Sequence, residues 1–358
     1  MTPNAAASQV QWAGFHGRGL RLETQDPLLM AALASRLREL LEPEPPGLPC
    51  LSFRFVPVAS LAESPVRPPQ GALRRLLDLP GGLAGYDPVS DRIYARHGDL
   101  GELSADPRSG EVLAAYQPSG PGRWLASHFL FTLPFLEQQK RAGRFSLHGS
   151  SLSLDGKGVI FAGQSGCGKS TLTVALLRAN LCRDGNGGTA EPCAQPGARA
   201  SYGSPRVGFQ GDDTFFLEQA ADGIHSLAFP EEIDVTEQTA RWVPELRGLL
   251  ETPLPPGWPK RQAHARDVFG ARIEWRLRPS LLLFPHISHR PNSEAHPLTR
   301  AEALSALAHN VLLTEPRATQ AHLDALGCLV RQCACYRLET GTDLDALPEF
   351  LLGLAGGG

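Results

Sequence analysis

The sequence is poor in lysine and in long apolar runs. Only four of its 34 Lys and Arg residues are lysines: Lys140, Lys157, Lys169 and Lys260. A formal net charge of −3 over 358 residues argues against a protein that binds nucleic acid through massed positive charge. The longest apolar runs, such as residues 129–136, fall far short of the roughly 20 residues that a membrane span needs. We therefore expect neither a nucleic-acid partner nor a membrane partner.

The sequence also lacks a regular cysteine pattern and an evident secretory leader. Residues 1–9 contain no basic segment followed by an apolar one, so we expect no leader. The cysteines are odd in number and irregularly spaced, which indicates reduced thiols rather than a disulfide framework. We therefore expect a cytoplasmic location. The seven cysteines are Cys50, Cys167, Cys182, Cys193, Cys328, Cys333 and Cys335.

Glycine and proline are abundant, with 37 and 31 residues, but 42 % hydrophobic residues in periodic segments predict a globular chain of two domains. Residues 1–144 read as a smaller α+β domain, because short alternating runs are separated by turn residues. We predict strands at 19–24, 51–58, 91–95 and 111–117, a helix at 27–41, and a long helix at 123–144 that Pro134 is expected to kink.

The pattern changes at residue 145, and residues 145–358 are predicted to form an α/β domain. We expect strands at 146–154, 158–162, 207–209, 214–217, 280–284 and 334–338, and helices at 170–179, 300–314, 319–328 and after Asp343. Residues 183–206 are rich in Gly, Pro, Ala and Ser, which is typical of an insertion.

One segment of this domain satisfies the phosphate-binding pattern G-x-x-x-x-G-K-[ST] between a predicted strand and a predicted helix. Backbone N–H groups of such a loop turn inward around phosphate, and the helix N-terminus adds a favourable dipole. The lysine then binds the β- and γ-phosphates, and the first hydroxyl binds Mg²⁺. The candidate nucleotide-binding residues are Gly163, Gln164, Ser165, Gly166, Cys167, Gly168, Lys169, Ser170 and Thr171.

Two further blocks decide between the enzymes that use such a loop. Asp212 and Asp213 stand together at the end of a predicted strand, and His148 precedes Gly149 on the strand before the loop. An ABC transporter ATPase would suit the loop equally well. However, no Leu-Ser-Gly-Gly-Gln type of signature and no apolar strand ending in Asp-Glu follows it.

The three blocks together resemble the HPr kinase/phosphorylase family and its P-loop relatives found with peptide-modifying systems. The nucleotide site of that family is related to that of phosphoenolpyruvate carboxykinases. The resemblance is clear over residues 145–217 and does not cover the first 140 residues. It implies an α/β kinase core with ATP and Mg²⁺ as cofactors. It also implies a catalytic role for Lys169, proton transfer by Asp212, metal binding by Ser170 and Asp213, and a role for His148 near the γ-phosphate or the acceptor. The roles of the two aspartates can be exchanged.

The sequence therefore predicts a kinase that transfers the γ-phosphoryl group of ATP to a hydroxyl, most readily a Ser of a small protein or peptide. The domain at 1–144 would recognise the acceptor or mediate assembly, and a homo-oligomer is left open. A small-molecule kinase of the same fold is one alternative. A nucleotide-binding accessory module without transfer activity is another.

Other polar groups carry weaker predictions. Glu231 and Glu232 could supply a second metal ligand, and Lys260 and Arg261 could reach phosphate, but solvated pairs are the simpler interpretation of both. The histidines at 286, 289 and 296 lack carboxylates or cysteines at zinc-ligand spacing. The cysteines at 328, 333 and 335 read as packed thiols. Cys167 lies inside the loop, where N–H groups and Lys169 would lower its pKa.

Overall fold

The structure is a computed structural model that describes residues 7–43, 50–79, 81–183, 206–256, 258–288 and 290–356. The chain divides into two compact units. The first comprises Met1–Ala142 with Pro255–Trp258, and the second comprises Gly143–Leu254 with Pro259–Gly358. The sequence did not indicate that a segment near residue 256 belongs with the first unit. Most of the predicted insertion, residues 184–205, lies outside the described residues.

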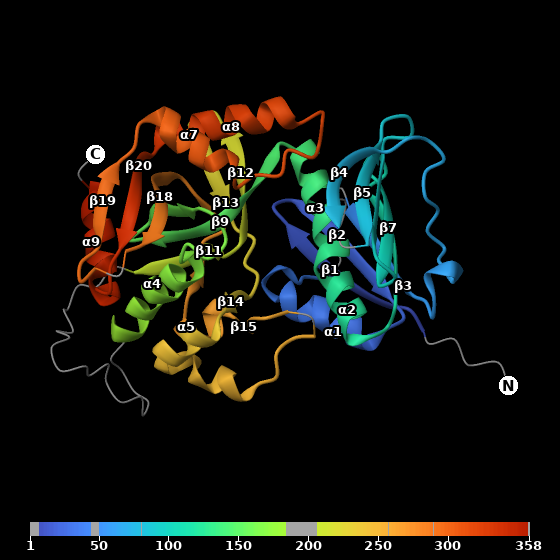
Figure 1. Ribbon diagram of the computed structural model, residues 1–358, viewed down its shortest axis with the longest axis horizontal. Helices are drawn as coiled ribbons and strands as arrows, with labels where there is room; N and C mark the ends of the chain where they lie inside the picture. Colours follow the sequence, from blue (N-terminus) through green and yellow to red (C-terminus); the bar gives the residue numbers. More distant parts are fainter. Residues whose placement is uncertain are drawn as a thin grey trace. The chain divides into compact units, whose positions relative to one another are not determined.

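The first unit is built on an eight-stranded sheet in the order β1-β2-β3-β8-β7-β6-β5-β4 (Figure 1). The neighbours β2, β3 and β8 run parallel, and the remaining pairs are antiparallel. The strands are β1 (Gln9–Phe15), β2 (Arg18–Thr24), β3 (Cys50–Pro57), β4 (Arg74–Leu79), β5 (Gly82–Asp87), β6 (Arg92–His97), β7 (Gly101–Asp106) and β8 (Glu111–Tyr116).

Helices α1 (Pro27–Arg36), α2 (Gly120–Ser127) and α3 (Phe129–Arg141) belong to this unit, with short 3-10 turns at Arg38–Leu40 and Leu61–Glu63. Aromatic pairs join α3 to the sheet: the rings of Phe15 and Phe135 lie 5.1 Å apart, and those of Phe53 and Phe131 lie 4.9 Å apart. Burial of such rings supplies much of the apolar stabilisation of a core.

The single long helix predicted at 123–144 is wrong, because the chain breaks at His128 between α2 and α3. His128 has φ −107° and ψ −82°, and its ring stacks on Trp124 with centroids 3.5 Å apart. Its Nδ1 also lies 3.0 Å from the Trp124 carbonyl oxygen, so the side chain occupies the end of α2. Pro134, where a kink was expected, lies inside α3.

The second unit is built on a ten-stranded sheet whose main path is β17-β13-β12-β9-β10-β18-β20-β19, with β11 between β9 and β16. Strands β10, β18 and β20 run parallel. A separate two-stranded sheet pairs β14 (Ile233–Val235) with β15 (Arg261–Ala263). The other strands are β9 (Arg144–Leu154), β10 (Lys157–Ala162), β11 (Val207–Gly211), β12 (Thr214–Ala220), β13 (Gly223–Leu227), β16 (Arg272–Ile273), β17 (Arg276–Leu277), β18 (Pro279–Ile287), β19 (Glu294–Pro297) and β20 (Ala334–Thr340).

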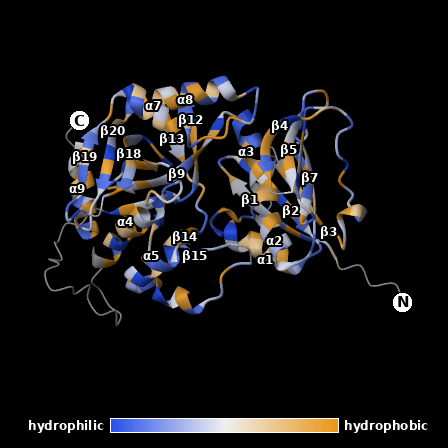
Figure 2. Cartoon of the chain, viewed as in Figure 1, coloured by the Kyte–Doolittle hydropathy of each residue, from blue (hydrophilic) through white to orange (hydrophobic). Residues whose placement is uncertain are grey.

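Both faces of this sheet are buried, because successive residues of β10 pack into different cores. Val159 and Phe161 pack with α4 (Lys169–Arg183) and α9 (Leu347–Gly356). Ile160 packs on the other side with α7 (Arg300–Ala308) and α8 (Thr319–Gln332). Figure 2 shows the mixed hydrophilic and hydrophobic colouring of α7 and α8 that is expected when one helix face covers a sheet. The remaining helices are α5 (Glu237–Trp242) and α6 (Ala265–Phe269), with 3-10 turns at Pro244–Glu251 and Leu344–Ala346.

Two predicted helices end earlier than expected. The helix predicted at 300–314 stops at Ala308, because Asn310 competes for its last carbonyls. The Asn310 backbone N–H donates to Leu307 O, and its side-chain amide donates to Ala306 O at 2.9 Å. The helix predicted at 27–41 likewise gives way to a 3-10 turn after Arg36. Within the described part of the chain, no helix is both long enough and apolar enough to cross a membrane.

Candidate active site

The strand β9 changes partners along its length, and this change creates the site. Its first half pairs with β12, where His148 lies opposite Thr214. Its second half pairs with β10 and β11. Gly149 stands at the change, where a Cβ would lie 2.5 Å from the Phe161 carbonyl oxygen, so only glycine fits. Asp212 and Asp213 occupy the link between β11 and β12 and therefore lie beside this part of β9.

A glycine-rich loop, residues 163–168, connects β10 to the first turn of α4. Gly166 and Gly168 have φ of +85° and +100°, a region that glycine enters at no steric cost. Gln164, Ser165 and Gly166 are exposed, whereas Ser170 and Thr171 are half-buried in the first turn of the helix. Strand, glycine-rich loop and helix N-terminus thus follow one another as an anion-binding loop requires.

Lys169 is 7 % exposed and folds back over this loop. Its Nζ donates hydrogen bonds to the carbonyl oxygens of Gly163 at 2.7 Å and Gln164 at 3.2 Å. These two bonds hold the ammonium group inside the curve of the loop. A phosphate bound there would meet this charge directly.

Asp212 is 1 % exposed and only half satisfied. Its Oδ1 accepts hydrogen bonds from the Ser150 hydroxyl of β9 and, at 3.3 Å, from the Thr173 hydroxyl of α4. Its Oδ2 is buried and has no hydrogen-bond partner among the residues that the structure describes. Burial raises the pKa of Asp212, against the lowering effect of the nearby Ser150 and Ser170 hydroxyls. A carboxylate left in this state is suited to binding a cation or a proton.

Asp213 differs from Asp212 in its exposure, its backbone conformation and its partners. Its side chain is 64 % exposed, and its backbone has φ +80°. Its Oδ1 lies 3.1 Å from His148 Nδ1, which also lies 3.0 Å from the Asp213 carbonyl oxygen. Burial tends to raise the pKa of Asp213, but contact with His148 and the charges of His148, Lys260 and Lys169 lower it overall. Asp213 is therefore ionised and accessible.

Asn310 is a site residue that the sequence analysis missed. Its side chain is buried, and its Oδ1 accepts from the Gly163 N–H at 3.0 Å. Its carbonyl oxygen accepts from the His148 N–H at 2.8 Å. One residue thus joins the start of the loop to the strand that carries His148. No sequence signal identifies it, because Asn310 follows an ordinary amphipathic helix.

The β14–β15 strand pair and α5 adjoin the first turn of α4. The Thr171 hydroxyl lies 3.3 Å from that of Thr239, whose own hydroxyl lies 2.9 Å from that of Thr236, the residue before α5. Asp234 of β14 faces Lys260, with Nζ and Oδ2 3.4 Å apart. Glu232, predicted as part of a solvated pair, instead lies 3.3 Å from His264 Nε2.

Among the described residues, the other histidines and cysteines singled out in the sequence do not form a metal site. His286 lies 3.9 Å from Glu339, His296 lies 3.6 Å from Glu294, and His289 is outside the described residues. Across the described ranges, no group of three or more His, Cys, Asp or Glu side chains is placed to hold a metal. Burial raises the pKa of Cys335 to about 11, and Cys333 is also buried, with its pKa raised.

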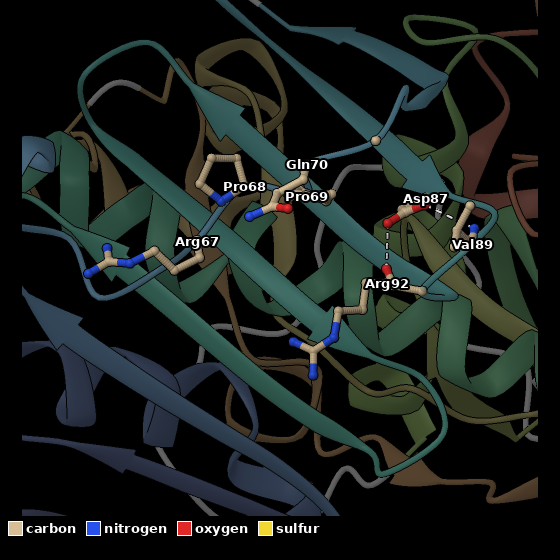
Figure 3. A pocket seen from close by; sticks show the side chains of 9 residues that line it. Arg67, Pro68, Pro69, Gln70, Asp87, Val89 and Arg92 are labelled. Carbon is tan, nitrogen blue, oxygen red and sulfur yellow. Dashed lines mark hydrogen bonds between the residues drawn. The ribbon is translucent and has the colours of Figure 1, made fainter.

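Two hollows on the described surface contain none of the predicted residues. One, of about 400 Å³ in the first unit, is shown in Figure 3. It is lined by Arg67, Pro68, Pro69, Gln70, Gly71, Asp87, Val89, Ser90 and Arg92. The other, of about 370 Å³ in the second unit, is lined by Ser153, Asp155, Gly156, Arg206, Arg272 and Glu274.

No protein-family model matches the chain, and no curated protein sequence matches it. One solved structure similar to the chain is the HPr(Ser) kinase/phosphatase from Coxiella burnetii. The two are 12 % identical, the alignment covers 58 % of this chain and 94 % of that chain, and the TM-score is 0.28. Values this low carry no argument about activity.

Proposed function

We propose that the second unit is an ATP- and Mg²⁺-dependent kinase that transfers the γ-phosphoryl group to a hydroxyl. The observation that carries the proposal is Asp212, a buried carboxylate with one unpartnered oxygen beside the first turns of α4. Lys169 and Asp213 supply the positive charge and the accessible carboxylate that phosphoryl transfer also needs. The glycine-rich loop and the pair of aspartates in this chain support the proposal without any argument from similar structures.

In this reaction the acceptor oxygen forms a bond to the γ-phosphorus while the bond from that phosphorus to the β–γ bridging oxygen breaks. The acceptor proton passes to a carboxylate, and ADP leaves. Lys169 would exchange its bonds to the loop carbonyls for bonds to the phosphates. Transfer of this kind depends mainly on positioning and charge neutralisation.

The residues present fit a Mg²⁺ ion, because the buried Oδ2 of Asp212 offers an oxygen ligand of the type that Mg²⁺ prefers. When bound, Mg²⁺ neutralises charge across the β- and γ-phosphate oxygens. Ser170 and Asp212 would hold it from the protein side. Without the ion the pKa of Asp212 is raised, and a nearby cation favours the ionised form of this carboxyl group.

The difference in exposure favours exchanging the two aspartate roles that the resemblance implied. A general base must come within hydrogen-bond reach of the acceptor hydroxyl. Asp213 and His148 meet this requirement, with side chains 64 % and 40 % exposed, whereas Asp212 is 1 % exposed. We therefore assign proton acceptance to Asp213, positioned by His148, and the metal side to Asp212. A Ser of a small protein or peptide remains the proposed acceptor class.

The test follows transfer of label from γ-labelled ATP to small proteins, Ser-containing peptides and small alcohols. Asp213→Asn should lower the rate about 10²- to 10⁴-fold with nucleotide binding retained, because only proton acceptance is lost. Lys169→Ala should lose nucleotide binding as well. Asp222→Asn, at an exposed aspartate paired with His225, is the matched control and should keep full activity. Nucleotide binding without any transfer would show an accessory module, and labelling only of small alcohols would show a small-molecule kinase.

A further inference from the structure

Lysine is scarce in this chain, and the charges of two of its four lysines lower the pKa of one aspartate. Lys140 is buried in an ion pair with Glu137, 2.6 Å away, and Lys157 donates to the Ala355 carbonyl oxygen at 3.1 Å. Lys169 and Lys260 lie far apart in sequence, yet the charges of both act on Asp213. Arginine is the usual basic residue here, so a compact ammonium at both positions suits contact with a phosphoryl group in a confined space.

The antiparallel pairing of β14 with β15 positions Lys260. Lys260 directly precedes β15, and its Nζ lies 3.4 Å from Oδ2 of Asp234 on the paired strand. The Thr171–Thr239 contact at 3.3 Å ties the α5 segment that follows β14 to the first turn of α4. The β14–β15 strand pair therefore lies near the same helix end as Lys169, and the side chain of Lys260 is about one-third exposed, at 32 %.

From this geometry we propose that Lys260 is a second cationic contact for the transferred phosphoryl group, opposite Lys169. This inference rests on the proposed kinase function and adds a specificity to it. Lys169, bonded inside the loop, serves the β- and γ-phosphates, whereas Lys260, outside the loop, serves only the terminal one. The site would therefore distinguish a nucleoside triphosphate from a diphosphate.

The test measures ATP and ADP affinities in the presence of Mg²⁺ by calorimetry on the full chain. The wild type should bind ATP at least ~10-fold more tightly than ADP, as expected for one charge-assisted contact. Lys260→Met should lower this ratio by about 10-fold, because only the contact of Lys260 is lost, and leave ADP affinity within about 3-fold of wild type. Retained ADP binding shows that the variant is folded, and Lys260→Gln replaces it if it is not. Lys157→Met, a lysine bonded to α9, is the matched control and should keep the wild-type ratio.

The outcomes separate the inference from the function on which it rests. An unchanged ATP-to-ADP ratio in Lys260→Met, or a wild type that does not prefer ATP, overturns the role of Lys260 while leaving the kinase proposal intact. A wild type that binds neither nucleotide overturns both. Lys260→Arg keeps the charge and should retain most of the preference, which loss of a merely structural contact would not predict.

Discussion

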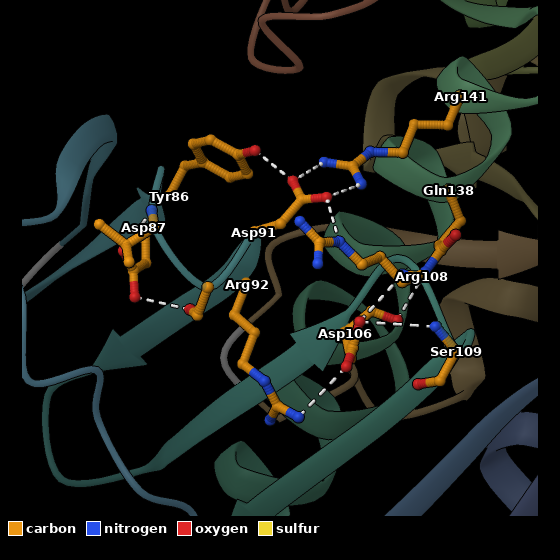
Figure 4. A network of polar contacts seen from close by, with 11 residues as sticks. Tyr86, Asp87, Asp91, Arg92, Asp106, Arg108, Ser109, Gln138 and Arg141 are labelled. Carbon is orange, nitrogen blue, oxygen red and sulfur yellow. Dashed lines mark hydrogen bonds and ion pairs between the residues drawn. The ribbon is translucent and has the colours of Figure 1, made fainter.

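The two units each contain a buried aspartate, and the two are treated in opposite ways. In the first unit Asp91 is fully buried, and both of its oxygens accept hydrogen bonds (Figure 4). Arg141 donates to Oδ1 at 2.8 Å and to Oδ2 at 3.0 Å, Arg108 donates to Oδ2 at 3.1 Å, and the Tyr86 hydroxyl donates to Oδ1. In the second unit Asp212 receives only hydroxyl donors, and one of its oxygens receives none among the described residues.

The pKa shifts follow this difference. Hydrogen bonds from Arg141 hold the pKa of Asp91 well below its ordinary range despite burial. For Asp212, burial is the larger effect, and its pKa is raised. A buried carboxylate whose two oxygens both accept hydrogen bonds stabilises the fold. One with an unpartnered oxygen lowers the stability of the fold, and binding of a ligand to that oxygen restores stability. The two aspartates therefore differ in how completely the fold satisfies their carboxylate oxygens.

The largest expected effect is the loss of stability in Asp91→Asn. The substitution leaves Arg141, whose side chain is only 15 % exposed, half-satisfied, so the free energy of unfolding should fall by about 3–5 kcal/mol. Because the folded pKa is lowered, this contribution is present above the unfolded pKa of about 4 and is lost as pH falls through the folded value. Chemical denaturation across pH measures both effects.

A matched pair on the same sheet provides the control. Asp99 is 87 % exposed and pairs with Arg96 at 3.1 Å, so Asp99→Asn should change stability by less than about 1 kcal/mol. Equal losses of stability from Asp91→Asn and Asp99→Asn would show that burial and complete pairing of the carboxylate make no difference to stability.

The next effect is smaller and has the opposite dependence on pH. Asp212 has a raised folded pKa, so its ionisation costs wild-type stability as pH rises from about 4 through the folded value. Asp212→Asn removes this cost. At about pH 5 the variant should lie within roughly 1.5 kcal/mol of wild type, and it should become relatively more stable by about pH 8. Denaturation midpoints at the two pH values measure this difference. A variant whose stability relative to wild type falls as pH rises would show that Asp212 is well paired.

The local part of the candidate site could be predicted from the sequence, because a strand, a glycine-rich loop and a helix are adjacent in the chain. The sequence also placed Asp212 and Asp213 between two strands. What differs between these two carboxyl groups could not be predicted, since it depends on the pairing of β9 with β11 and β12 beside them. Ser150 reaches Asp212 from 62 residues away, and Asn310 reaches Gly163 from 147 residues away.

The polar network of the first unit was missed for the same reason. Asp91 appeared only as the first residue of a predicted strand. Its arginine partners lie 17 and 50 residues along the chain, on a turn and on a helix. Single arginines in a chain that uses arginine at 30 positions carry no signal of pairing. The break at His128 likewise depends on ring stacking that helical spacing does not reveal.

The smallest expected effects come from removing one hydroxyl donor from each aspartate. Tyr86→Phe and Ser150→Ala should each cost about 1 kcal/mol, the usual net value of one hydrogen bond. Their pH profiles should nevertheless differ. Asp91 keeps its arginine donors after Tyr86→Phe, so stability near neutral pH should stay flat. Asp212 loses a donor that lowers its pKa, so Ser150→Ala should move the pH-dependent loss of stability to higher pH. Denaturation at several pH values distinguishes the two, and parallel profiles would mean that Ser150 does not hold the charge of Asp212.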